Sequence, residues 1–553
     1  MKRTTAGILA VLLTISLAGC GRDKVSVVPT ETNRGAEEQQ VASTTNKDTA
    51  KLYINLGGEP EYLDPLLAKS TEEKTLVANS FVGLYTYNAK GTLVTAIAAD
   101  EAEVSEDGCK YTIHLKETKW SNGDPLLAED FVYSWNRAIS LEEAGVDTGC
   151  FAPIARAEDG SLLVEATDNL TLEITLTGPC PYFTSLLAKP AYAPVHKASV
   201  MAANPAGNTP GAWTWEAGFV CNGAYQLAQW QHDEFMSYDR NPNFYDAANV
   251  TMPGLYVMVN ADAADAYTAY NGGDLDFADE LPEDVMDELV TDEEYHRTGA
   301  LSVSYLMFSP TASLFAEMEP KQAADYRQAI SRLIQRKAFT SHMMGANGEV
   351  ATNWMLPGLG DGNGGIYEST NKAIYRSKDV MGLLEPYGFV FTEQEDHSYT
   401  CEPALEIPVL VPENAEKQAL VELLQQQAAQ VGITLTPEVV DEGTYAARVE
   451  SGAYTMTFGE MSASYDDAAS MILPLLGESE EEVALATEIT TTTDPTVRLA
   501  RLHDAEALIW NQYRYLPLYV TSDGYLLKSN ISGVYTLGGG EKLYFYATKK
   551  DEG

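Results

Sequence analysis

The sequence predicts an α/β protein built from several lobes. Alternating apolar residues indicate short strands such as 111–115 and 170–176, and apolar residues at helical spacing indicate helices such as 415–430. The segment 407–435 combines a strand, a helix and a second strand, which is the crossover that joins parallel strands. A length of 553 residues with 45% apolar residues is enough for roughly three domains of about 150 residues each.

The N-terminus has the features of an export signal. Met1-Lys2-Arg3 is basic, an apolar run follows, and small residues precede Cys20. The apolar run is too short for a membrane-spanning helix. Leu17-Ala18-Gly19-Cys20 resembles the lipobox of bacterial lipoproteins, which implies cleavage after a signal peptide of residues 1–19 and a diacylglycerol on the Cys20 sulfur. The alternative is an ordinary secretory signal that ends near a cysteine.

A polar tether follows over residues 20–50. It contains almost no bulky apolar residue after Val28, so it cannot bury enough surface to fold. The diacylglycerol expected on Cys20 has two acyl chains, which suffice for stable membrane anchoring. We therefore expect an extracytoplasmic protein that is held to the cell membrane through Cys20. The net charge of -44 argues against nucleic acid as a partner and against membrane contact other than the anchor.

The cysteines after Cys20 leave the disulfide pattern open. There are five of them, an odd number, so at least one thiol is expected to stay free even though export permits disulfides. They are Cys109, Cys150, Cys180, Cys221 and Cys401. Because no two cysteines form a CxxC pair, a thioredoxin-like or zinc-ribbon site is not supported.

Order is expected to begin with a strand over 51–56, and the most informative string follows at 115–137. Asn122-Gly123-Asp124-Pro125 predicts a turn. Glu129-Asp130 then favours a helix start, since acidic residues interact well with a helix N-terminus. The string as a whole resembles the signature of the extracytoplasmic solute-binding proteins of the peptide/nickel family.

The resemblance extends over nearly all of the expected mature chain, through blocks at 170–195, 221–245, 267–276 and 516–519. It implies a two-lobed, periplasmic-binding-protein-like α/β fold with an extra subdomain and a cleft that closes about a hinge. The implied division of the chain is lobe I at 51–85 and 211–300, its subdomain at 86–210, lobe II at 301–515, and a return to lobe I at 516–553.

Within the second lobe, apolar spacing predicts one amphipathic helix over 326–338. Four basic residues cluster on it, namely Arg327, Arg332, Arg336 and Lys337. We expect these side chains to be solvated or paired with nearby acids, and binding of a ligand carboxylate is the alternative.

The resemblance implies capture of short peptides for an ABC-type importer with permease and ATPase subunits, by a monomer without catalytic residues, metal or cofactor. In oligopeptide binders an alanine-aspartate-tyrosine triplet holds the ligand α-ammonium, but here the triplet reads Ala463-Ser464-Tyr465. Asp466 or Asp467 could substitute by a small shift, or the ligand lacks a free amine; a role of both carboxylates at a helix N-terminus is the alternative. The residues expected to contact ligand are Glu59, Asn222, Tyr305, Tyr445, Ser462, Ala463, Ser464, Tyr465 and Asp466.

Two other binding functions and one enzymatic function stay open. A relative of the same fold could bind nickel, a metallophore or a sugar. None of the seven histidines forms an HExxH motif, and no GxSxG elbow occurs, so metalloprotease and esterase sites are unsupported. A secreted hydrolase stays open as the enzymatic function, because a glycosidase, for example, needs only a carboxylate pair, which 80 acidic residues always allow.

Overall fold

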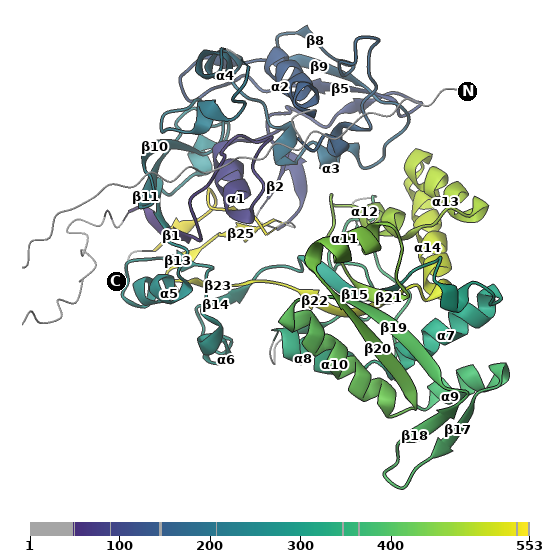
Figure 1. Ribbon diagram of the computed structural model, residues 1–553. Coiled ribbons are helices and arrows are strands. Elements are labelled where there is room, and N and C mark those ends of the chain that lie inside the picture. The colour runs from purple at the N-terminus through teal and green to yellow at the C-terminus, as the bar shows by residue number, and fades with distance from the viewer. Residues whose placement is uncertain are drawn as a thin grey trace, which may run out of the picture. The chain divides into compact units, whose positions relative to one another are not determined.

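The computed structural model describes residues 48 and 50–550, apart from 89, 143–145, 206, 345–347, 363–364 and 538–539. The expected signal 1–19, Cys20 and nearly all of the tether 20–50 lie outside the described residues. Among the helices of the described part, none combines the length and the apolarity needed to cross a bilayer. The chain forms three larger sheets and five two-stranded ladders within the described ranges (Figure 1).

A seven-stranded sheet is assembled from distant parts of the chain around β1 (Leu52–Leu56). This strand runs parallel to its two neighbours, and Leu52 pairs with Leu255. Leu52 and Ile54 enter one core, whereas Tyr53 enters a second core on the other face. A strand covered on both faces reads as a nearly continuous apolar run, and Leu-Tyr-Ile-Asn-Leu is one, with Asn55 as its single polar residue. The strand order is β10 (Tyr225–Gln231), β11 (Phe235–Arg240), β12 (Gly254–Val259), β1, β13 (Phe277–Ala278), β23 (Gly524–Leu527) and β14 (Tyr295–Arg297).

A six-stranded sheet contains the predicted strand–helix–strand unit. β19 (Leu405–Pro412) and β20 (Ile433–Val440) pair in parallel, and α10 (Ala415–Ala429) joins them and packs against both, as Figure 1 shows. Asn414 begins α10, since its side chain accepts a hydrogen bond from the Lys417 backbone N–H. The prediction for 407–435 is therefore confirmed. The strand order is β16 (Glu349–Val350), β22 (Tyr515–Thr521), β15 (Ser302–Phe308), β21 (Met456–Met461), β19 and β20.

The prediction of one helix over 326–338 is wrong, because the segment contains two helices. α7 (Pro320–Leu333) ends at Ile334, whose φ of -72° and ψ of 112° are extended, and α8 (Arg336–Met344) begins after Gln335. The Gln335 backbone N–H donates to the Gln427 side chain at 2.8 Å instead of continuing the helical ladder. Ile334 stays buried on either path, so apolar spacing could not reveal the break.

Two of the basic side chains on these helices are also not placed as expected. Arg327 and Arg336 are buried, and they donate to backbone carbonyl oxygens, Arg327 to Gln512 at 2.8 Å and Arg336 to Pro517 at 2.6 Å. Neither forms an ion pair with a carboxylate in the described part of the chain. Backbone carbonyl groups satisfy these guanidinium groups, which no charge pattern in the sequence could have indicated.

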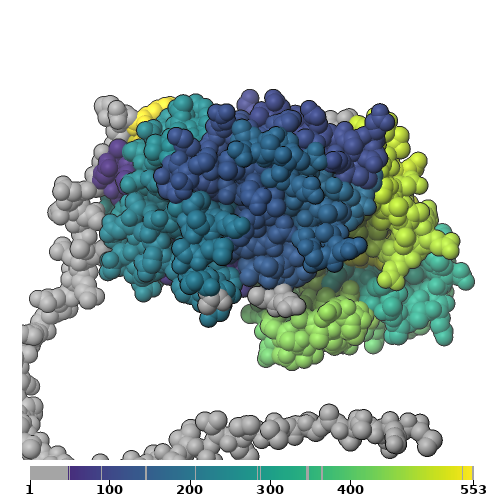
Figure 2. All heavy atoms as spheres, turned by 90° about the horizontal axis from the view of Figure 1, so that it is seen from above, coloured from purple at the N-terminus to yellow at the C-terminus, as the bar shows by residue number. Residues whose placement is uncertain are grey.

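The signature string builds one side of a subdomain whose atoms form a continuous blue surface in Figure 2. Gly123 adopts a φ of 94° in the turn, a conformation that favours glycine. Asp130 then accepts hydrogen bonds from the Trp120 indole and from the Leu127 backbone N–H, which fixes the start of α2 (Ala128–Ser140). The same subdomain holds a four-stranded sheet in the order β4 (Glu103–Val104), β5 (Lys110–His114), β9 (Thr171–Thr175) and β8 (Val164–Asp168).

Two short segments connect the two largest sheets, 298–301 between β14 and β15 and 522–523 between β22 and β23. They are tied together, because the Thr298 backbone N–H donates to the Asp523 carbonyl and Leu301 donates to the Thr521 carbonyl, both at 2.9 Å. The return that we expected at 516 lies inside β22, which pairs within the six-stranded sheet. We propose these paired segments, with the return at 522, as the hinge of the two lobes.

The remaining elements complete the cores around these sheets. All five cysteines in the described ranges are free thiols. The further helices are α1 (Thr71–Ser80), α3 (Phe183–Leu186), α4 (Lys197–Ala203), α5 (Ala263–Asn271), α6 (Met286–Leu289), α9 (Asp379–Leu384), α11 (Glu442–Glu450), α12 (Ala469–Ile472), α13 (Glu480–Thr491) and α14 (Pro495–Gln512). The ladders are β2 (Tyr85–Tyr87) with β3 (Leu93–Thr95), β6 (Thr118–Lys119) with β7 (Pro125–Leu126), β17 (Val390–Glu393) with β18 (Tyr399–Glu402), β24 (Ile531–Ser532) with β27 (Thr548–Lys549), and β25 (Tyr535–Thr536) with β26 (Lys542–Leu543).

Candidate ligand-binding site

The loop after β21 carries two adjacent carboxylates with different partners. Asp467 is 1% exposed and accepts two hydrogen bonds from the Arg498 guanidinium, at 2.8 and 2.7 Å. Arg498 also donates from Nε to the Ile489 carbonyl at 2.9 Å. Paired twice and fully enclosed, Asp467 anchors the loop to α14 and is not available to a ligand.

Asp466, in contrast, retains binding capacity. Its Oδ1 accepts a hydrogen bond from the Gly360 backbone N–H at 2.8 Å, and no described group donates to its Oδ2. Burial raises the pKa of Asp466, and the neighbouring charge of Asp467 raises it further. A carboxylate that has lost water and has no paired cation attracts one, because a cation restores the interactions that burial removed.

Aromatic rings and one lysine from the subdomain contact this loop. The ring of Tyr465 stacks on that of Tyr182, with centroids 4.4 Å apart and planes at 10°. The Lys189 ammonium donates to the Ser464 carbonyl oxygen at 2.9 Å. The pKa of Tyr465 is raised by burial and by the nearby Tyr182 hydroxyl. Segments more than 270 residues apart in sequence therefore meet at the loop.

Two further tyrosines lie within the electrostatic reach of Asp466. The pKa of Tyr87 and that of Tyr535 are raised above the ordinary value, first by burial and then by the negative charge of Asp466. Tyr87 ends β2 and Tyr535 begins β25. Two phenol groups are thus within electrostatic reach of the Asp466 carboxylate, which forms no ion pair with a cation among the described residues.

Two other predicted residues, Tyr305 on β15 and Tyr445 on α11, pack at the six-stranded sheet. Tyr305 on β15 is 8% exposed and meets the ring of Tyr515 edge-on at 5.7 Å, and burial raises its pKa to about 12. The Tyr445 hydroxyl is 3.0 Å from the Thr457 hydroxyl and donates to the Phe458 carbonyl at 3.1 Å. These rings can wall a binding surface, and their role in ligand contact stays a prediction.

Ser302, at the start of β15, and Ser462, just after β21, form no hydrogen bond with each other in the described part of the chain. Ser302 donates to the Glu460 carboxylate and lies against the Thr521 hydroxyl. Ser462 is exposed, and Ala463 beside it is half-buried without a side chain that could bond. Of these three residues, Ser462 is the one with an exposed hydroxyl that has no hydrogen bond to another described residue.

Asn222 lies just before β10 and Glu59 just after β1, beside the seven-stranded sheet, and both side chains already have hydrogen-bond partners. The buried Asn222 amide bonds the Val82 backbone twice, accepting from its N–H at 3.1 Å and donating to its carbonyl at 2.9 Å. Glu59 accepts from the Trp230 indole at 2.8 Å and pairs with the His232 ring at 2.6 Å. These contacts hold turns of lobe I, and a role in ligand binding stays a prediction for both residues.

Sequence reasoning missed the groups that complete the Asp466 site, namely Tyr87, Tyr182, Gly360, Arg498 and Tyr535. Each comes from a different element, so no spacing along the chain connects them. The only available signal was the block 180–187, which the resemblance covers without indicating a contact with 465.

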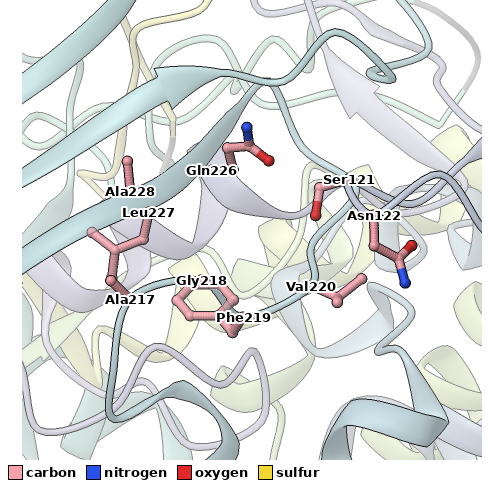
Figure 3. Close-up of a pocket in the computed structure, with 9 residues that line it drawn as sticks. All are labelled: Ser121, Asn122, Ala217, Gly218, Phe219, Val220, Gln226, Leu227 and Ala228. Atoms are coloured by element: carbon pink, nitrogen blue, oxygen red, sulfur yellow. The ribbon is translucent and has the colours of Figure 1, made fainter.

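A separate pocket of about 330 Å³ lies beside β10, away from this loop. Figure 3 shows the Phe219 ring and the Leu227 side chain on its apolar side, and the amides of Asn122 and Gln226 on its polar side. None of the predicted ligand residues lines it. In the described part of the chain, no group of three or more His, Cys, Asp or Glu side chains is arranged to hold a metal ion.

Comparison with known proteins identifies the fold and the family. The sequence profile named "Bacterial extracellular solute-binding proteins, family 5 Middle" matches residues 92–482. The chain belongs to this family. This confirms the predicted resemblance to the peptide/nickel group and makes the protein an extracytoplasmic solute-binding protein. Its relatives are binding proteins and not enzymes.

Similarity to characterised proteins extends over the whole body. The chain is 26% identical over 504 residues to the probable deoxycholate-binding periplasmic protein YgiS of Escherichia coli K12, covering 87% of this chain and 89% of that one. It is 24% identical over 572 residues to the oligopeptide-binding protein OppA of Bacillus subtilis 168, covering 98% of both.

Solved structures confirm the predicted two-lobed α/β fold of periplasmic-binding-protein type. The unliganded open form of the murein tripeptide-binding protein MppA matches with a TM-score of 0.76 at 21% identity, covering 90% of this chain and 97% of that one. OppA of Haemophilus influenzae in complex with the peptide RPPGFSPFR matches with a TM-score of 0.64 at 22% identity, covering 90% and 99%.

Proposed function

We propose that this protein captures short peptides outside the cytoplasm and delivers them to an ABC-type importer. Membership in the family supports a binding role, and several relatives are named for peptides, among them the oligopeptide-binding OppA and the dipeptide-binding DppE of Bacillus subtilis 168. The partners proposed are the permease and ATPase subunits of the importer. The protein acts as a monomer and performs no covalent chemistry.

The observation that carries the proposal is the difference between Asp466 and Asp467. Both carboxylate oxygens of Asp467 are bonded to Arg498, whereas Asp466 is partly buried and its Oδ2 accepts no hydrogen bond from the described residues. In the proposed complex, the α-ammonium of the peptide donates to Asp466, two positions beyond Ser464. Asp466 thus takes the role of the aspartate that the triplet Ala463-Ser464-Tyr465 lacks at position 464.

Ligand capture follows from closure of two lobes about the paired segments 298–301 and 522–523. A ligand closes the lobes because it contacts both only in the closed state. An extended peptide presents backbone N–H and C=O groups that pair with strand edges whatever its side chains are. The stacked pair of Tyr182 and Tyr465 supplies one wall beside the ammonium site.

The main competing ligand class is an amphipathic anion, since one relative is named for deoxycholate. The Asp466 carboxylate disfavours such a ligand, because two like charges in a partly buried site repel each other. The absence of a described metal-ligand cluster gives no support to a directly bound nickel ion. Peptide is therefore the class that the charge of the site favours.

Native mass spectrometry of the purified full chain tests the ligand class. We expect a heterogeneous set of short-peptide masses that disappears on denaturation, and a single carbohydrate or metal-complex mass would contradict the proposal. Calorimetry with one peptide in free and N-acetylated form then tests the ammonium site. Acetylation removes the charge, so we expect binding to weaken at least tenfold; equal affinities would contradict the role of Asp466.

We also propose that Cys20 carries the lipid that keeps the protein at the membrane. The support is Leu17-Ala18-Gly19-Cys20 after a basic and apolar leader. We expect Cys20→Ser to appear in the soluble extracytoplasmic fraction with unchanged peptide affinity. A Cys20→Ser protein that still sediments with membranes in 1 M salt, about the ionic strength that screens charges beyond roughly 3 Å, would contradict it.

A further inference from the structure

A basic surface lies on the second lobe, where the α7–α8 junction meets the segment 372–378. The Arg376 backbone N–H donates to the Arg332 carbonyl at 2.9 Å, and the Gln335 side-chain amide donates to the Tyr375 hydroxyl at 3.0 Å. The Ala373 backbone N–H donates to the Thr352 carbonyl at 2.6 Å. Two contacts therefore hold the α7–α8 junction beside the segment 372–378, and the third ties that segment to Thr352.

Six cations gather there, and none forms an ion pair with a carboxylate in the described part of the chain. The positive charges are thus available to an anion from outside the chain. The six are Arg332, Arg336, Lys337, Lys372, Arg376 and Lys378.

A pocket of about 330 Å³ opens at this junction. Arg336 in its wall is 5% exposed, and its donors meet carbonyl oxygens and the Ser331 hydroxyl without any carboxylate. Burial and the charge of Arg332 lower the pKa of Arg336 to about 10, because its positive charge is not compensated. The residues that line the pocket are Ile334, Gln335, Arg336, Lys337, Ala338, Val350, Thr352, Ala373 and Tyr375.

The remaining polar groups of the pocket suit the oxygen atoms of an anion. Lys337 is exposed at the first turn of the nine-residue α8, and no described group accepts from its backbone N–H or from that of Arg336. Thr352 and Tyr375 contribute hydroxyl groups. Ammonium and backbone N–H groups together are a frequent arrangement for binding phosphate oxygens.

We propose that this pocket is a second binding site, separate from the peptide site, that takes a phosphate group. Lys337 is the exposed cation at its wall, and Arg336 supplies a fixed positive charge behind it. The surrounding basic residues make this region attractive to phosphate on a protein whose net charge of -44 repels anions elsewhere. The phosphate group comes either from free phosphate compounds or from a phospholipid headgroup.

The test measures binding of inorganic phosphate to the purified full chain by equilibrium dialysis with labelled phosphate. We expect one saturable site. Lys337→Gln should weaken it at least tenfold, while Lys378→Gln, which removes a neighbouring charge outside the pocket, should change it less than twofold. Ala373→Trp keeps every charge but fills the pocket, so it should abolish binding; melting temperatures and peptide affinity, which must stay as in the wild type, show that each variant is folded.

Sedimentation with vesicles of anionic phosphatidylglycerol distinguishes the two sources. Vesicle binding that requires Lys337 and is displaced by inorganic phosphate assigns the group to a headgroup, and no vesicle binding beside saturable phosphate binding assigns it to a soluble compound. The proposal is overturned if neither phosphate nor vesicles bind saturably. It is equally overturned if Lys337→Gln and Lys378→Gln weaken binding alike, since the attraction then belongs to the whole basic surface.

Discussion

Replacing the Asp466 carboxylate by an amide isolates the proposed ammonium site. In Asp466→Asn, the side-chain oxygen can still accept from the Gly360 backbone N–H, which in the wild type lies 2.8 Å from Oδ1. The shape of the loop and the Asp467–Arg498 pair are also kept. The variant therefore removes one negative charge from the site and little else.

The expected loss follows from the burial of the carboxylate. At an effective dielectric constant of about 20, opposite unit charges roughly 3.5 Å apart attract each other by about 5 kcal/mol. Desolvation of both groups offsets part of this, so a net loss of about 2–3 kcal/mol is expected for a charge-assisted pair. This corresponds to peptide binding that is about 30- to 150-fold weaker.

Isothermal titration calorimetry with a free-amine peptide measures this loss, and Asp396→Asn, at an exposed carboxylate far from the loop in sequence, is the matched control. The pKa of Asp466 lies above the usual 3.8, and the charged form is the one that binds. Wild-type affinity should therefore be full above the raised pKa and decline as pH falls through it, whereas the variant should show no such decline. Affinities of wild type and Asp466→Asn within twofold at neutral pH would refute the reasoning.

The remaining predictions concern stability, measured by calorimetric or urea unfolding. Arg498→Met leaves the Asp467 carboxylate buried without its cationic partner and should lower the unfolding free energy by about 3–5 kcal/mol. Adding Asp467→Leu removes the unpaired charge and should restore most of this loss. An unfolding free energy of Arg498→Met equal to that of the wild type would contradict the pairing. Asn222→Ala should cost about 2–4 kcal/mol by leaving the Val82 backbone unpaired; an unchanged unfolding free energy would contradict this structural role, and a loss of peptide affinity beside it would assign Asn222 to the ligand as well. Burial alone would raise the pKa of Glu482, but hydrogen bonds and a nearby guanidinium lower it to about 2 from 4.5. Its charge therefore stabilises the fold above pH 4.5, so Glu482→Gln should cost about 1–2 kcal/mol at neutral pH, and this cost should vanish as pH falls toward 2; a cost that is independent of pH would contradict the assignment.

Local patterns predicted the elements that depend on neighbouring residues. The crossover at 407–435 and the turn and helix of the signature string appeared as expected, because periodicity and helix-end chemistry act within a few residues. The helix over 326–338 failed at Ile334, where a hydrogen bond from Gln335 to the distant Gln427 side chain replaces the helical one. A competing partner from another element is invisible to periodicity.

The candidate site shows the same limit. The resemblance pointed to the loop 462–467, but it could not distinguish Asp466 from Asp467. The two carboxylates differ because Arg498 donates two hydrogen bonds to Asp467 and none to Asp466. Arg498 belongs to α14, which begins 28 residues after Asp467. Tyr182 reaches the loop from more than 270 residues before it.

By itself, the sequence determined the family, the α/β class and the loop in which the ligand carboxylate was to be sought, because these are carried by contiguous strings. Only the tertiary structure decided which carboxylate is free, which arginines are enclosed by carbonyl groups, and where unpaired cations gather. The physical reason is that availability of a charge depends on what lies opposite it in space, and the groups opposite come from segments that the linear order keeps apart.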